Sequence, residues 1–272
     1  MKSLKRTQMT PTQISIRTSL GILIFSCVVA AAETPEEKGM AVAIAADKAD
    51  EGWDDWSAET RMILRNRQGQ SSQRQMRFKA LEEKEEGDKR LIIFDEPRDI
   101  KGTAFLVYTK KTGQDDQWLY LPALKRVKRI SSKNQSGPFV GSEFAYEDLS
   151  SQEVEKYTYR HLREETLASM DCHVLERIPV DKKSGYSKQI AWIDKAEYRL
   201  MKVDYYDRKG SHMKTMTAIG YNSYSGNYWR AERFEMKNHQ TGKSTDLIWS
   251  NYHFNSGIRE QDFRSSRLKN VR

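Results

Sequence analysis

Apolar and polar residues alternate along most of this chain from Trp56 onward. In the segment 56–64 one face carries Trp56, Ala58, Thr60, Met62 and Leu64, and the other face is mostly polar or charged. Alternation with a period of two is typical of a β-strand that buries one face. Similar segments follow at short intervals, and the turns between them are too short to contain a crossover helix. The pattern therefore predicts antiparallel hairpins in sequence order.

The same alternation recurs along the chain as far as residue 254. The predicted strands are 56–64, 73–81, 91–94, 103–109, 117–121, 127–130, 156–163, 172–178, 187–193, 199–206, 212–224, 228–237 and 244–254. Many short strands joined by Gly-bearing turns indicate one continuous, strongly curved antiparallel sheet. No change in composition marks a second domain, so we expect a single domain over residues 33–272.

One long helix is predicted, from Glu36 to Trp53. Pro35 stands at its start, and Glu36 and Glu37 lie in the first turn, where they complement the helix dipole. Helical spacing places the apolar residues on two neighbouring lines, Met40, Ala43 and Ile44 on one and Val42, Ala45, Ala46 and Ala49 on the other. We expect this broad face of small residues to cover the sheet.

The first 32 residues have the pattern of a secretory signal. Basic residues precede an apolar run over 20–29, and Ala30-Ala31-Ala32 stands directly before Glu33. The apolar run is too short to span a bilayer, so we expect an exported chain that begins near Glu33. As a second alternative, Ile24-Phe25-Ser26-Cys27 is similar to a lipobox, in which Cys27 carries a lipid anchor.

No motif for catalysis or for metal binding stands out. The five histidines, His161, His173, His212, His239 and His253, each stand alone in predicted strands or turns, without HExxH, Cys-x-x-Cys or an Asp-rich calcium loop. There is also no G-x-S-x-G motif. The sequence therefore predicts no metal, no cofactor and no enzyme.

The net charge of +8 includes a dense basic run at Lys125, Arg126, Lys128 and Arg129. Basic residues next to aromatic ones are found in nucleic-acid-binding proteins, but an exported chain rarely meets that ligand. Two interpretations stay open. The run forms the solvated face of a strand, or it contacts an anionic partner such as phospholipid headgroups or an acidic protein surface.

Large aromatic residues are numerous for a sheet with so few helices to cover it. They form either a packed core or the lining of a cavity for a hydrophobic ligand. The loop from Ser131 to Gly141 has the polar composition of a mobile segment, and three aromatic residues lie in it or shortly after it. The candidate ligand-binding residues are Trp118, Tyr120, Phe139, Phe144 and Tyr146.

Three segments carry a family likeness. They are Asp99–Thr103, Gln117–Ile130 and Gly141–Leu149, with the sequences DIKGT, QWLYLPALKRVKRI and GSEFAYEDL. In this order and spacing they resemble the exported LolA-like proteins, outer membrane lipoprotein-sorting proteins of the branch associated with exporters of the resistance-nodulation-division (RND) type. The likeness covers the chain from about Trp53 to its end.

The resemblance implies a half-open β-barrel, LolA/LolB-like and covered by the N-terminal helix, that shelters acyl chains in the periplasm. It implies a monomeric carrier or accessory for lipid or acylated cargo, with peripheral membrane contact and an inner-membrane RND-type exporter as partner. In this hypothesis residues 131–146 form a gate over the cavity. The alternative is a non-enzymatic sensor or binding module for a membrane transporter, with a solid core and no cargo.

Overall fold

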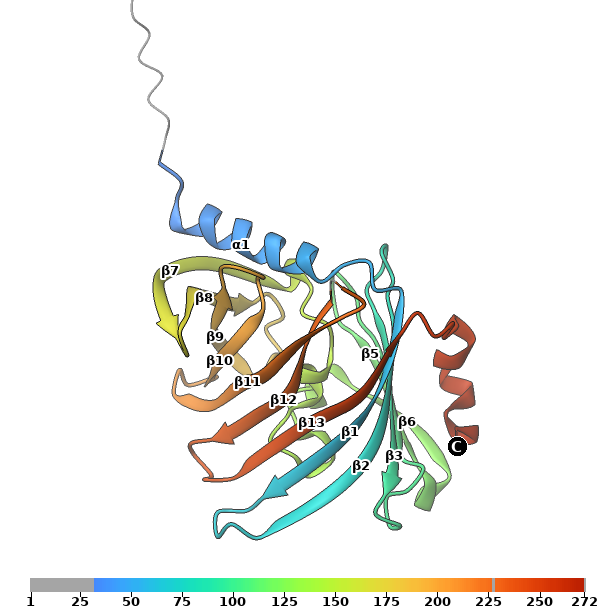
Figure 1. The fold of residues 1–272 in the computed structure, drawn as a ribbon. Coiled ribbons are helices and arrows are strands. Elements are labelled where there is room, and N and C mark those ends of the chain that lie inside the picture. The colour runs from blue at the N-terminus through green and yellow to red at the C-terminus, as the bar shows by residue number, and fades with distance from the viewer. Residues whose placement is uncertain (1–31, 227, 272) are drawn as a thin grey trace, which may run out of the picture. The chain divides into compact units, whose positions relative to one another are not determined.

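The computed structural model describes residues 32–226 and 228–271 (Figure 1). Apart from Ala32, these residues belong to one compact unit, Glu33–Arg272. Apart from Ala32, the predicted signal sequence lies outside the described residues, as does the candidate anchor Cys27.

Thirteen antiparallel strands form a single sheet in the described part of the chain. They are β1 (Asp55–Arg65), β2 (Ser71–Leu81), β3 (Lys89–Glu96), β4 (Ala104–Tyr108), β5 (Asp116–Leu121), β6 (Arg126–Ile130), β7 (Tyr157–Leu167), β8 (Met170–Pro179), β9 (Tyr186–Asp194), β10 (Leu200–Asp207), β11 (His212–Tyr224), β12 (Tyr228–Asn238) and β13 (Ser244–Phe254). Each predicted strand is present, and β11 and β13 have the predicted bounds. The prediction of a mainly β protein with one curved antiparallel sheet is confirmed.

The strand order is β6-β5-β4-β3-β2-β1-β13-β12-β11-β10-β9-β8-β7. The sheet thus consists of two meanders, which join where β1 pairs with β13. Strands β6 and β7 follow one another in the chain but lie at opposite edges, so the sheet is curved without being closed (Figure 1). Residues 131–156 must run from one edge to the other, and we call them the crossing segment.

The concave face and part of the opposite face of the sheet are covered. The large core lies on the concave face, where Phe94 and Phe105 are fully buried beneath the crossing segment. A second cluster lies on the opposite face of β3 to β5, under 3₁₀ turns at Glu260–Phe263 and Ser265–Asn270 (Figure 1). Phe263 and Leu268 are buried there, a cover that the sequence pattern did not predict.

The helix α1 spans Pro35–Ala49 and is therefore shorter than predicted. A capping box between Thr34 and Glu37 fixes its start. Its buried residues are Gly39, Val42 and Ala43. Met40 and Ile44 are 37% and 52% exposed, so the prediction that they share the packed face is wrong. The face that packs against β7 therefore combines Ala43 of the first line with Val42 of the second, and Ala49 at the end of the second line is exposed.

Candidate functional site: the crossing segment on the concave face

Three aromatic residues of the crossing segment pack into the concave face. The Phe139 side chain is fully buried, with its ring centroid 5.8 Å from that of Phe94 and 5.1 Å from that of Phe105. The Tyr146 ring lies 5.5 Å from Phe139 and 5.3 Å from Phe105, and Phe144 is 3% exposed in the same core. A segment with a polar composition therefore supplies the centre of the apolar core.

Buried polar contacts hold the same segment against β11 to β13. The Lys214 ammonium donates to the Asp148 carboxylate at 2.7 Å and to the Glu143 carbonyl at 2.9 Å. The Glu143 carboxylate accepts from Asn238 at 2.7 Å, and the Glu143 amide donates to the Thr245 hydroxyl at 3.0 Å. These bonds fix how Phe144 and Tyr146 are presented to the core.

Glu147 ties the crossing segment to the turn between β8 and β9. Its carboxylate accepts hydrogen bonds from the Ser184 hydroxyl at 2.7 Å and from the Gly185 amide at 2.9 Å. Burial raises the pKa of Glu147 to about 7, and the neighbouring Asp148 charge adds to the effect. Ionisation of Glu147 therefore disfavours the position in which the crossing segment packs against the sheet.

The structure separates the five candidate ligand-binding residues. Phe139, Phe144 and Tyr146 lie together on the concave face. Trp118 and Tyr120 lie in the cluster on the opposite face, beside Phe263 and Leu268 of the C-terminal turns. Alternation along β5 places Gln117 and Leu119, instead of the two aromatic residues, toward the concave face.

The basic candidates lie at a free edge. Lys125, Arg126, Lys128 and Arg129 are exposed, and within residues 32–226 and 228–271 β6 pairs with β5 alone. Arg129 forms an ion pair with Asp116, whereas the neighbouring Leu124 is 69% exposed at the tip of the same hairpin. An exposed leucine among basic side chains is a pattern suited to an anionic, partly apolar surface.

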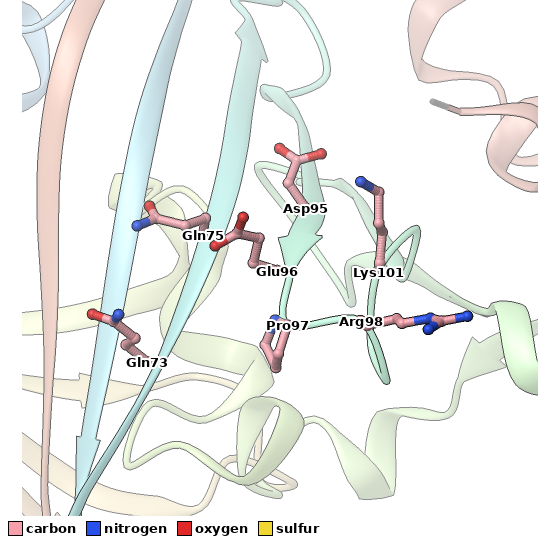
Figure 2. Close-up of a pocket in the computed structure, with 7 residues that line it drawn as sticks. All are labelled: Gln73, Gln75, Asp95, Glu96, Pro97, Arg98 and Lys101. Atoms are coloured by element: carbon pink, nitrogen blue, oxygen red, sulfur yellow. The ribbon is translucent and has the colours of Figure 1, made fainter.

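The two pockets that stand out are polar. One, of about 560 Å³, lies at the end of β2 and β3, and its lining residues are Gln73, Gln75, Asp95, Glu96, Pro97, Arg98 and Lys101 (Figure 2). The other, of about 310 Å³, lies beside the β1–β2 turn. Neither has the aromatic lining that the sequence predicted for a ligand cavity. On the concave face, the side chains of the crossing segment fill the position where a ligand was expected.

The prediction that each histidine stands alone is wrong. His161 Nε2 lies 3.3 Å from His173 Nδ1, because β7 and β8 pair and a bulge between His161 and Arg163 shifts their register. Glu164 completes a group whose ligand atoms lie within 4.8 Å of one another. Its carboxylate already binds the ammonium groups of Lys38 and Lys195, which would compete with a metal ion. Only the hairpin register would have revealed this pair from the sequence.

Among the described residues, no helix is long and apolar enough to cross a bilayer.

Comparison with known proteins gives several relatives for this arrangement. A family model described as an uncharacterized protein matches residues 86–270. An outer membrane lipoprotein-sorting protein domain from Vibrio parahaemolyticus has 57% sequence identity and a TM-score of 0.85, over 86% of this chain and 99% of its own. A DUF1329 family protein from Desulfovibrio piger has 30% identity and a TM-score of 0.81, over 86% and 99% of the two chains.

A LolA superfamily protein from Nitrosomonas europaea shares the fold at 20% identity, with a TM-score of 0.66 over 83% of this chain and 97% of its own. A search of curated proteins gave no match.

Proposed function

Because this chain belongs to the LolA-like family of outer membrane lipoprotein-sorting proteins, we propose that it is a periplasmic carrier of lipid-like or lipoprotein acyl chains. It takes up such cargo on the concave face and transfers it between the inner and the outer membrane. In this proposal residues 1–32 direct export, the mature chain is a single monomeric domain, and an inner-membrane RND-type exporter is its partner. The role needs no catalytic group.

The observation that carries the proposal is the position of Phe139. It is the centre of the concave core, yet it belongs to a segment outside the sheet that bonds to the strands through side chains. Burying an acyl chain contributes about 0.8 kcal/mol per methylene group, so a chain of ten or more carbons competes with the few aromatic side chains that it displaces. The crossing segment then acts as the gate, with Phe139, Phe144 and Tyr146 as its apolar contacts.

The filled concave face favours a second function. A sensor or binding module for a membrane transporter would keep this solid core and use the exposed edge of β6 for contact. Native mass spectrometry of protein purified from the periplasm separates the two functions. A carrier retains lipid or acylated cargo as a defined added mass, whereas a sensor has the mass of the mature chain alone.

A reversible lock tests the gate directly. The Glu143 amide lies 3.0 Å from the Thr245 hydroxyl, so we choose Glu143→Cys with Thr245→Cys as the pair to be joined by a disulfide. We expect the oxidised protein to lose binding of a fluorescent acyl probe and the reduced protein to recover it. Each single cysteine variant is the control, and equal binding by oxidised and reduced protein would contradict the gate.

A further inference from the structure

A row of buried polar side chains crosses the concave face from β7 to β11. Strand register places Tyr159 opposite Arg177, Arg177 opposite Gln189, Gln189 opposite Tyr205, and Tyr205 opposite Lys214. Residues directly opposite in antiparallel strands point to the same face. Every member of the row is 8% exposed or less.

Arg177 is the member of this row without an electrostatic partner. Its side chain is 7% exposed, its Nε has no hydrogen-bond partner, and its guanidinium forms no ion pair among residues 32–226 and 228–271. The Tyr157 ring lies beside it, with its centroid 5.4 Å from the guanidinium carbon. A buried charge in this condition is costly, and proteins normally satisfy it with an anion.

The nearby carboxylates are already engaged. Glu176 precedes Arg177 in β8 but points to the opposite face, where it binds Arg160 and Lys188. Asp148 binds Lys214, and Glu147 accepts from Ser184 and Gly185. Among the described residues, Arg177 therefore forms no ion pair with either carboxylate of the crossing segment.

The surroundings of Arg177 offer donors. Burial raises the pKa of Tyr159 and Tyr205, and the Arg177 charge opposes that rise without cancelling it, so both hydroxyls stay protonated at neutral pH. The neighbouring Gln189 is 2% exposed, and its side-chain amide group carries two N–H donors. A guanidinium with tyrosine hydroxyls beside it has the donor chemistry that recognises a carboxylate or a phosphate.

From β8 to β12, the next row along the sheet is wholly apolar. Leu175 lies opposite Ala191, Ala191 opposite Val203, Val203 opposite Met216, and Met216 opposite Met236. These residues are 7% exposed or less and belong to the concave core. A polar row that contains the unpaired Arg177 therefore runs directly beside an apolar row.

We propose that Arg177 binds the anionic headgroup of an amphiphilic cargo, a carboxylate or a phosphate, whose acyl chain lies along the apolar row from Leu175 to Met236. This inference rests on the proposed carrier function and narrows its cargo to anionic amphiphiles. The guanidinium forms two parallel hydrogen bonds to the headgroup, as arginine does with planar oxyanions. The cargo reaches Arg177 after the crossing segment has left the concave face.

Calorimetric titration of the full mature chain with decanoate, decyl phosphate and decanol tests the headgroup. We expect the two anions to bind roughly tenfold more tightly than decanol, in line with a charge-assisted pair. Arg177→Met should remove this preference and leave decanol binding unchanged, and Arg177→Lys should restore part of it. Arg160→Met, which removes a guanidinium from the opposite face, is the matched control and should behave as wild type.

Different results overturn different claims. Equal affinity of the wild type for decanoate and decanol, or a preference that survives in a folded Arg177→Met protein, overturns the headgroup site and leaves the carrier function intact. Inorganic phosphate that binds as tightly as decyl phosphate overturns the amphiphile as its ligand. Binding of none of the three amphiphiles contradicts the carrier function itself.

Discussion

The Lys214 ammonium lies 2.7 Å from the Asp148 carboxylate, and both side chains are only 4% exposed. Lys214 belongs to β11 and Asp148 to the crossing segment, so this pair joins the sheet to its cover. The Asp148 carboxylate also accepts hydrogen bonds from the Tyr186 hydroxyl at 2.8 Å and from the Ala145 amide at 2.7 Å. The crossing segment is therefore held by a satisfied buried network as well as by its aromatic side chains.

Removal of one partner should weaken the fold strongly. Lys214→Met leaves the Asp148 carboxylate buried without a cation, which costs about 3–5 kcal/mol of unfolding free energy. Urea unfolding followed by tryptophan fluorescence measures the change. Lys214→Met with Asp148→Asn should be less destabilised than the sum of the single variants. Lys209→Met, at an exposed turn, is the control. A loss of unfolding free energy below about 1 kcal/mol in Lys214→Met would mean that the ion pair does not stabilise the fold.

Truncation of Phe139 should loosen the crossing segment. Phe139→Ala removes a fully buried ring between Phe94 and Phe105, and such cavities cost about 3–5 kcal/mol. Hydrogen exchange should quicken first at residues 131–149 and later in β1 and β13. Val140→Ala removes less from the neighbouring, partly buried position and serves as control. Uniform acceleration over the whole sheet would show that the segment has no independent opening.

The strands could be predicted because half-buried strands alternate locally, as 56–64 does. Their order could not, because the pairing of β1 with β13 joins segments about 190 residues apart and leaves no local pattern. For the same reason, the sequence could not show that the candidate ligand-binding residues lie on two different faces of the sheet. Alternation along β5 places Trp118 and Tyr120 on one face, but which face is concave depends on the C-terminal turns that cover the other.

The crossing segment and Arg177 show two further limits of prediction from the sequence. Polar composition predicted a mobile loop over 131–141, but the few apolar residues of a connection decide its packing when it runs beneath a curved sheet. Arg177 carries no signal in the sequence, because a charged residue in a strand is normally taken for the solvated face. Its burial follows from the register of β7, β8 and β9.

Gly39 sets the distance between α1 and β7. A Cβ atom at this position would lie 2.8 Å from the His161 nitrogen and 2.9 Å from the Arg160 carbonyl carbon, both backbone atoms. Gly39→Ala should therefore destabilise the protein, although alanine in an open helix is favoured by about 0.5–1 kcal/mol. Thermal unfolding and hydrogen exchange at 35–49 measure the effect, with Met40→Ala as the exposed control. A raised midpoint would contradict the close contact.

The edge of β6 should bind anionic membranes. Leu124→Ala with Lys125→Gln, Arg126→Gln and Lys128→Gln removes an exposed apolar tip and three exposed charges, while Arg129 keeps its ion pair with Asp116. Each charge near a membrane surface contributes about 1 kcal/mol, so binding to phosphatidylglycerol vesicles should fall on the order of 100-fold. Lys182→Gln with Lys209→Gln is the control at other exposed turns. Unchanged sedimentation with these vesicles would leave β6 as a solvated edge.

Glu147 should make the closed state sensitive to pH. Burial, with the Asp148 charge, raises the pKa of Glu147 from 4.5 to about 7 in the folded protein. The folded state therefore holds the proton more tightly than the unfolded chain, and the free energy of unfolding falls as pH rises from about 4.5 to about 7. Above that range the ionised carboxylate stays as a constant cost.

Glu147→Gln removes the ionisation and keeps an acceptor oxygen for Ser184 and Gly185. At pH 8 the variant should be more stable than the wild type, by on the order of 1–2 kcal/mol after allowance for solvent, and the difference should vanish near pH 4.5. Burial also raises the pKa of Glu153 to about 7, so the unfolding free energy of the variant still falls as the pH rises, but less steeply. Urea unfolding from pH 4.5 to 8 gives both profiles, with Glu155→Gln as the exposed control. Parallel profiles for the wild type and Glu147→Gln would place the pH response elsewhere in the core, because ionisation of Glu147 should separate the two profiles as the pH rises.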